Sequence, residues 1–205
     1  MPFNMFRRQL NARERAVADR LPPGQYLTEK WPVLHYGSVP RVNLATWDFT
    51  MDGLIQADRP LRLTRDELLE LPRRTVKSDV HCVTRWSLLD STWEGVPISE
   101  LMKLVQLKSE ASHVMVRAEQ GFTANLSLDD FLREENMLVD TRNGEPISPE
   151  HGWPLRLFVP HLYFWKSAKW VRGFEFIHGD RPGFWEQYGY HMRGDPWAEE
   201  RYGWQ

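Results

Sequence analysis

Polar and apolar residues alternate over several short stretches of the chain, as they do in β-strands that turn one face toward a core. The clearest alternation is that of Trp47, Phe49 and Met51, within a strand predicted over residues 44–54. Further strands are predicted over residues 74–83, 113–118, 122–128, 155–159 and 173–177, and a hairpin over residues 137–147. The chain is therefore predicted to be rich in β-structure.

Helix signals are present, but they are short. Thr64 and Glu67 form a capping-box pattern that predicts a helix over residues 65–71. Other short helices are predicted from Ser99 to about residue 105 and after a cap at Ser127 and Asp130, with a polar helix over residues 5–20. About eight strands with three or four short helices, in no regular βαβ alternation, predict a mixed, β-rich α+β fold. We interpret residues 1–30 as a peripheral arm and residues 31–205 as one domain.

Composition and charge argue against several classes of protein. With a net charge of −2 and a pI near 6.4, the chain has no general attraction for nucleic acid or anionic membranes. No run of about 18 apolar residues is present, so membrane insertion is not expected. The pair Arg7-Arg8 precedes polar residues rather than an apolar segment, so no export signal is predicted. The single cysteine fits a reducing compartment and predicts a cytoplasmic location.

That cysteine, Cys82, falls at the end of the strand predicted over residues 74–83. A lone cysteine is more often a small buried hydrophobe than a reactive group. Here His81 and Arg85 can favour the thiolate, and a strand end can present it to a ligand. The thiolate would then be a soft metal ligand, or a nucleophile paired with a histidine. Zinc is disfavoured, because the cysteine and histidine spacings of zinc sites are missing.

A second group of candidate residues lies in the segment HGWPLRLFVP, residues 151–160, and in the WKSAKW sequence that follows. Arg156 is on a predicted strand, and Ser167 and Lys169 are in a turn after it. Guanidinium and ammonium groups suit a phosphate or pyrophosphate, although a solvated basic edge is an alternative. No dinucleotide or P-loop motif is present. The aromatic segment 182–205 is predicted to be docked on the body as a structural cover.

Together these two groups resemble the molybdopterin-binding domain of the sulfite oxidase superfamily, and in particular its short stand-alone bacterial members. The resemblance covers roughly residues 30–202. It implies that the Cys82 thiolate is a direct molybdenum ligand. It also implies that the pterin and its phosphate are held by His35, Tyr36, Thr123, His151, Arg156, Ser167, Ala168 and Lys169. The substrate side is expected to be lined by Tyr36, His81 and Arg85.

The activity implied by this resemblance is oxygen-atom transfer on a small molecule, with one molybdenum-molybdopterin per chain. It includes S- or N-oxide reduction and sulfite-like oxidation, with an electron donor or acceptor that the sequence does not identify. Sulfite is disfavoured, because Leu34-His35-Tyr36 stands where sulfite-oxidising members have an arginine. The haem and dimerisation domains of larger members are not recognised in these residues, which leaves the assembly state open, with a monomer as one option. The alternatives are a storage or delivery protein for the cofactor without turnover, and a metal-free acyl-transfer enzyme using a Cys/His pair.

Overall fold

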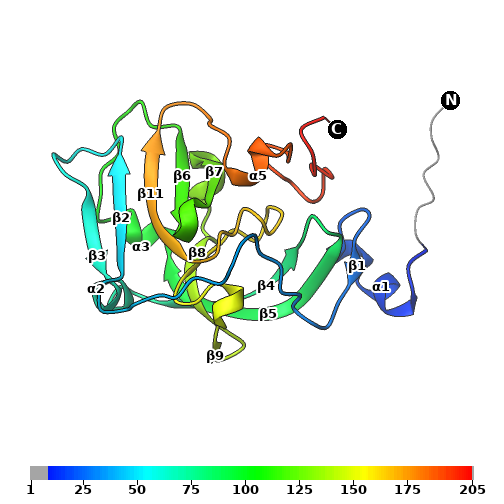
Figure 1. Ribbon diagram of the computed structural model, residues 1–205. Helices are drawn as coiled ribbons and strands as arrows, with labels where there is room; N and C mark the ends of the chain where they lie inside the picture. Colours follow the sequence, from blue (N-terminus) through cyan, green and yellow to red (C-terminus); the bar gives the residue numbers. More distant parts are fainter. Residues whose placement is uncertain (1–8, 205) are drawn as a thin grey trace.

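Two β-sheets flanked by short helices form the body of the protein in this computed structural model, which describes residues 9–204 (Figure 1). Both sheets contain antiparallel pairs and one parallel pair each. The helices are short and do not alternate regularly with the strands. The mixed, β-rich α+β fold predicted from the sequence is therefore confirmed.

The five-stranded sheet has the order β3-β2-β11-β6-β7. Its strands are β2 (Asp48–Gly53), β3 (Leu61–Thr64), β6 (His113–Ala118), β7 (Thr123–Ser127) and β11 (Val171–Ile177). The central strand β11 pairs in parallel with β2 and antiparallel with β6. Trp47, Phe49 and Met51 are all buried, as their alternation predicts, although the strand begins only at Asp48.

The six-stranded sheet is organised around one long strand, β5, which pairs with β1, β4 and β8. Its strands are β1 (Tyr26–Leu27), β4 (Arg74–His81), β5 (Trp86–Pro97), β8 (Met137–Arg142), β9 (Glu145–Pro146) and β10 (Arg156–Phe158). The predicted hairpin is present as β8 and β9. Its turn residues Asn143 and Gly144 both have positive φ, at 52° and 81°, as this type of tight turn requires.

The sequence pattern did not predict β5, although it is the longest strand described. Ser87 and Ser91 are buried within it, and Asp90 interrupts its extended backbone with a φ of 59°. The serine hydroxyls are satisfied by other strands, since Ser87 Oγ lies 2.8 Å from His81 Nδ1 and Ser91 Oγ accepts from Arg142. These polar residues at core positions interrupt the alternation of polar and apolar residues along β5. The residues that allow their burial are distant in the sequence.

Short helices close the ends of the sheets. The capping box at Thr64 is confirmed, because its hydroxyl accepts from Glu67 N while Glu67 accepts from Thr64 N at 2.7 Å. Ser127 caps a further helix by accepting from Asp130 N at 3.1 Å. The helices are α1 (Ala12–Ala16), α2 (Arg65–Leu69), α3 (Ile98–Leu101), α4 (Leu128–Phe131) and α5 (Phe184–Gln187), with 3₁₀ turns at Ala18–Arg20, Glu119–Gly121 and Pro149–His151.

The N-terminal region lies at one end of the molecule (Figure 1). Residues 5–8 of its predicted helix lie outside the described residues, and α1 covers only part of the rest. Arg20 joins this region to the body through Asp79 at 2.7 Å and Asp90 at 3.1 Å. Among residues 9–204, no helix is long and apolar enough to cross a membrane.

Buried side chains form two separate hydrophobic clusters. The first core contains the edge-to-face phenyl rings of Phe49, Phe131 and Phe174, with aliphatic residues of the five-stranded sheet around them. The second core surrounds the end of β4 and contains Cys82 together with Trp86, Trp93, Tyr163, Phe164 and Trp165. Cys82, the first candidate for chemistry, therefore lies in the second core.

Candidate functional site

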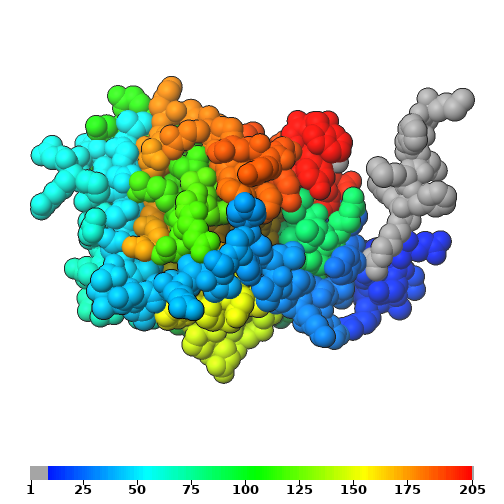
Figure 2. Space-filling model, viewed as in Figure 1, coloured from blue at the N-terminus to red at the C-terminus, as the bar shows by residue number. Residues whose placement is uncertain are grey.

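A cavity of about 340 Å³ opens beside the second core. Its walls come from the loop at residues 31–36, the turn after β4, residues 119–122, the segment 156–170 and the C-terminal segment 184–190. The 31–36 loop, drawn in blue, crosses the face of the molecule shown in Figure 2. Segments from five separate parts of the sequence thus meet around one cavity.

Cys82 is held rigidly in this wall by a tight turn. Its backbone N donates to Trp86 O at 2.9 Å, and its carbonyl accepts from Arg85 N at 2.9 Å. Thr84 Oγ1 donates to the cysteine Sγ at 3.2 Å. Burial raises the pKa of the Cys82 thiol, while the Thr84 hydrogen bonds and the positive charge of Arg156 oppose the rise. A cation bound at the sulfur would favour the thiolate, so this position suits a metal ligand.

Arg156 is a buried cation with no anionic partner in the described part of the chain. Its Nη1 donates to the carbonyl of His151 at 2.9 Å, and its guanidinium lies 3.9 Å from the ring centroid of Phe164. Among the described residues, its Nε has no hydrogen-bond partner. Burial lowers the pKa of Arg156 to about 9. A buried and unpaired guanidinium beside a cavity is costly without an anion, so the position suits a phosphate group.

Lys169 supplies a second cation to the same cavity. Its Nζ donates to the carbonyl of Leu34 at 2.7 Å and to the carbonyl of Glu150, which joins the 31–36 loop to the body. Burial, with the charge of Arg156, lowers its pKa to about 7. Between these two cations, Ser167 and Ala168 also line the cavity, but the Ser167 hydroxyl is occupied in accepting from Val159 N at 2.9 Å.

The loop over the cavity is positioned by aromatic contacts. His35 and Tyr36 both line the cavity, with the His35 ring edge-on to Trp170 at 5.7 Å. The ring of His151 stacks on Trp31 at 3.9 Å, and its Nε2 lies 3.3 Å from the Trp31 carbonyl. Trp31 lines the cavity, whereas His151 does not line it and instead holds Trp31 in place through these contacts.

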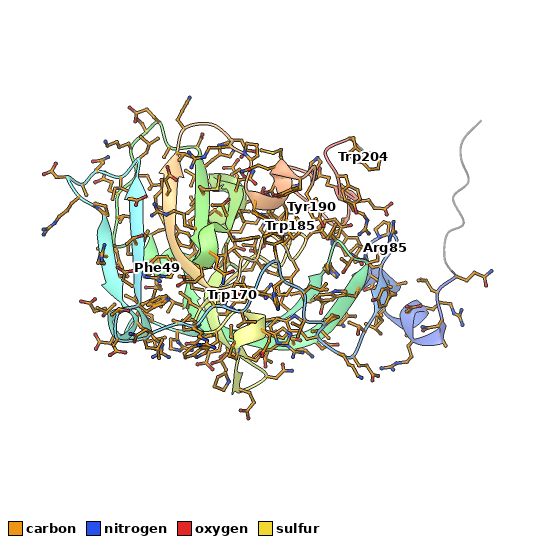
Figure 3. All side chains as sticks on the ribbon, viewed as in Figure 1. Phe49, Arg85, Trp170, Trp185, Tyr190 and Trp204 are labelled. Atoms are coloured by element: carbon orange, nitrogen blue, oxygen red, sulfur yellow. The ribbon has the colours of Figure 1, made fainter. Side chains whose placement is uncertain are left out.

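Four predicted site residues are not among the residues that line the cavity: His81, Arg85, Thr123 and His151. Successive side chains of an extended chain point to opposite faces, so His81 turns away where Cys82 turns toward the cavity. Thr123 follows Phe122, which lines the cavity in its place. The guanidinium of Arg85 instead lies beside Gly24, and Figure 3 shows Arg85 apart from the rings labelled Trp185 and Tyr190.

Several residues of this cavity wall were not predicted from the sequence. Trp165, Trp185 and Tyr190 all line the cavity, and Trp185 stacks on Tyr190 at 5.1 Å. The aromatic content of the C-terminal segment was a signal, but it equally predicts a structural cover. Thr84 was also missed, although a hydroxyl two residues after a lone cysteine is a local signal for a hydrogen bond to sulfur.

The arrangement also bears on the Cys/His alternative. The hydrogen bond described for the Cys82 sulfur comes from Thr84, while His81, its sequence neighbour, is bonded to Ser87. An imidazole positioned to take the thiol proton is required for that chemistry. Among residues 9–204, no imidazole is hydrogen-bonded to this sulfur, which disfavours the acyl-transfer hypothesis.

Comparisons with known proteins support a redox function. A family model described as an oxidoreductase molybdopterin binding domain matches residues 36–185. The uncharacterised oxidoreductase YuiH of Bacillus subtilis is 48% identical over 193 residues, covering 94% of this chain and 96% of that protein. The catalytic subunit MsrP, a protein-methionine-sulfoxide reductase of Gluconobacter oxydans, is 25% identical over 175 residues, with 73% of this chain and 54% of that protein covered.

A solved structure shows the same fold. The sulfane dehydrogenase SoxCD of Paracoccus pantotrophus superposes with a TM-score of 0.63 at 22% identity. The match covers 71% of this chain and 41% of that one. The chain therefore spans nearly all of one curated relative but only about half of the larger proteins that it matches.

The side chains in the cavity fit a molybdenum-pterin group. The Cys82 sulfur is a soft ligand in a rigid turn, and the unpaired Nε of the buried Arg156 suits the phosphate of the pterin. Lys169 would add a second cation at the phosphate, and the indoles of Trp31 and Trp170 offer flat faces for a ring system. The chain belongs to the oxidoreductases that have a molybdopterin-binding domain, and its cofactor is molybdenum-molybdopterin.

Proposed function

We propose that this chain catalyses oxygen-atom transfer on a small molecule, in the direction of S- or N-oxide reduction. The observation that carries the proposal is that the Cys82 sulfur shares one cavity of about 340 Å³ with the rings of Tyr36, Trp185 and Tyr190. A small molecule held by these rings would lie beside the cysteine that we assign to the metal. The sulfoxide-reducing relative MsrP supports this direction.

Each side chain has a distinct part in this proposal. Cys82 holds the metal, while Arg156 and Lys169 neutralise the phosphate of the pterin. When bound, the cofactor supplies the two-electron redox chemistry that side chains lack. Tyr190 supplies a phenol to the cavity. Burial raises its pKa, so the hydroxyl stays protonated near neutral pH and can donate a hydrogen bond to a substrate oxygen.

Sulfite-like oxidation is the less favoured direction because the cavity has few cations to spare. Arg156 is the arginine that lines it and Lys169 is the lysine, and both are assigned to the cofactor. The carboxylate of Glu119, on the wall, pairs with Arg172 at 2.6 Å. An oxyanion would therefore find no free guanidinium or ammonium on the described part of this wall.

Reduction of an oxide requires two electrons and two protons from outside the substrate, so an electron donor is needed as a partner. The partners that we propose are a small-molecule substrate and an electron donor. The cytoplasmic location is a prediction from the single cysteine.

The test uses protein purified from a host that makes the cofactor. We expect about one molybdenum and one pterin per chain, and reduction of dimethyl sulfoxide or trimethylamine N-oxide with reduced benzyl viologen. Cys82→Ser should lose turnover, whereas Ser78→Ala, in the strand that leads to the cysteine, serves as the control. Loaded protein that oxidises sulfite but reduces neither oxide would contradict the proposed direction. Loaded protein inactive in both assays would favour a storage or delivery role.

A further inference from the structure

The C-terminal segment supplies a wall of stacked rings to the cavity. Phe184, Trp185 and Tyr190 line it, with Trp185 nearly parallel to Tyr190 at an interplanar angle of 20°. The ring of Tyr190 is also edge-to-face with that of Trp165, with 5.1 Å between ring centroids, and the ring of Tyr36 packs against that of Phe184 at 4.8 Å between centroids. We call Trp165, Phe184, Trp185 and Tyr190 the aromatic wall.

This wall needs an anchor, because α5 is a helix of four residues and cannot be stable by itself. Glu186, in α5, provides one. Its Oε1 lies 2.6 Å from Lys166 Nζ and accepts from Trp165 Nε1 at 2.8 Å. The Lys166 side chain is fully buried and that of Glu186 is 1% exposed. One carboxylate thus fixes the indole of Trp165 and the helix that carries Trp185.

Lys166 extends the same anchor to the rest of the wall. Its Nζ donates to the carbonyl and the side-chain oxygen of Asn125, at 2.9 and 2.8 Å, and to the carbonyl of Met192 at 2.6 Å. Asn125 is in β7, while Met192 lies two residues after Tyr190. The buried ammonium therefore joins the sheet to both ends of the segment that carries the rings.

A role in stability alone does not explain this ion pair well. Burial lowers the pKa of Lys166, and the charge of Glu186 only opposes that effect. Well-packed apolar residues often replace buried ion pairs at no cost in stability. What an ion pair with four directional contacts provides is a defined position for the groups it joins.

We propose that Lys166 and Glu186 are positioning residues for the substrate, through the aromatic wall, and that this wall receives the apolar substituents of an uncharged S- or N-oxide. The proposal rests on the function proposed above. The wall rings are uncharged, whereas the cations beside them are engaged elsewhere. Ring faces and edges suit thioether sulfur and aryl or alkyl groups.

The test compares Glu186→Gln with wild type, using methyl phenyl sulfoxide and dimethyl sulfoxide as substrates. The amide keeps the size of the side chain but leaves Lys166 without its counter-charge. We expect KM for the phenyl compound to rise about 10-fold, with kcat changed less and the preference over dimethyl sulfoxide reduced. Molybdenum and pterin contents should equal those of wild type. Glu175→Gln, which removes a surface pair with Arg181, should change none of these values.

A double variant, Lys166→Met with Glu186→Leu, guards against misfolding, because it removes both charges together. We expect it to fold and retain the cofactor, yet to show the same loss of preference. Unchanged KM and preference in a folded, loaded variant would overturn the proposal. Loss of molybdenum in parallel with the rise in KM would also overturn it, since Lys166 would then serve the cofactor.

Binding of methyl phenyl sulfide, followed by tryptophan fluorescence, separates this proposal from the proposed function. If wild type reduces no oxide but binds the sulfide, and Glu186→Gln binds it about 10-fold more weakly, the wall proposal stands while the proposed function fails. If wild type reduces oxides but the two proteins bind the sulfide equally, only the wall proposal fails. If wild type neither reduces oxides nor binds the sulfide, both proposals fail.

Discussion

The two cores of this protein differ in how completely the chain satisfies them. Phe49, Phe131 and Phe174 of the first core are fully buried against aliphatic side chains, and they carry no polar atoms. The second core also contains apolar side chains, but among its buried residues are the indoles of Trp86, Trp93 and Trp165, the phenol of Tyr163 and the thiol of Cys82, beside the buried guanidinium of Arg156. Buried polar atoms without a partner in or beside it include Trp86 Nε1, Trp93 Nε1, Tyr163 Oη and Arg156 Nε. Two of these residues, Trp86 and Arg156, line the cavity.

Stability and function therefore depend on different cores of this protein. In the first core, Trp47 Nε1 is the buried side-chain polar atom without a partner among the described residues, and the rest is closely packed apolar surface, so its residues should determine the free energy of unfolding. The second core has several buried polar atoms without hydrogen-bond partners among the described residues. A cofactor with a phosphate and with ring donors and acceptors can supply such partners. Functional sites are where a fold departs from the most stable packing, and the second core shows that departure.

The largest effect should come from truncating the first core. Phe174→Ala removes a ring that contacts Phe49 at 5.0 Å and Phe131 at 4.9 Å, and the closed packing leaves a cavity. We expect a loss of about 3–5 kcal/mol in the free energy of unfolding, measured with urea. The exposed Tyr188→Ala should change it little, and cofactor content per folded chain should stay constant. A loss below about 1 kcal/mol would mean that the two cores do not differ as argued.

The sequence predicted most of the elements of both sheets, but not the strand that organises the second one. β5 was missed because Ser87 and Ser91 occupy core positions, where hydroxyls are tolerated only with partners from β4 and β8. β3 and β1 were missed as well, and each is only a few residues long. Local alternation therefore predicts strands whose core face is apolar and fails where burial depends on long-range hydrogen bonds.

The site was predictable to the extent that local sequence fixes the direction of side chains. Cys82, Arg156 and Lys169 were proposed from local chemistry and meet at one cavity. His81 was proposed for its proximity to the cysteine, and the alternation of an extended strand turns it away. The aromatic wall could not be assigned, because its place depends on Lys166, whose burial is a tertiary property.

The second prediction concerns the cation that the second core leaves unpaired. Arg156→Met removes a buried charge that has no counter-ion. The cofactor-free variant should therefore lose at most about 1 kcal/mol in the free energy of unfolding relative to wild type. Loss of charge-assisted bonds to the phosphate should weaken cofactor retention by about 10- to 100-fold. Thermal unfolding of cofactor-free protein and pterin content after dialysis measure the two effects. The exposed Arg181→Met is the control. An Arg156→Met variant that unfolds easily yet retains the cofactor would assign Arg156 to stability instead.

The smallest effect should be a dependence of stability on pH that Lys169 introduces. Burial, with the charge of Arg156, lowers the pKa of Lys169 to about 7, below the ordinary value of 10.5. Above pH 7 the folded, cofactor-free chain therefore releases a proton that the unfolded chain still binds. Stability should rise with pH in this range, by at most about 1.4 kcal/mol per pH unit from this group.

Lys169→Met isolates this contribution, because it removes the titrating group while keeping an apolar side chain. Urea unfolding of cofactor-free protein at pH 7, 7.5, 8 and 8.5 should give a stability that rises more steeply for wild type than for the variant. Lys103→Met, which alters an exposed lysine paired with Glu100, should keep the wild-type slope. Cofactor bound in the cavity should remove the difference, since a phosphate beside Lys169 keeps the ammonium protonated. Equal slopes of stability against pH in cofactor-free wild type and Lys169→Met would show that Lys169 is solvated. The cavity would then not be the desolvated anion-binding site that distinguishes the second core from the first.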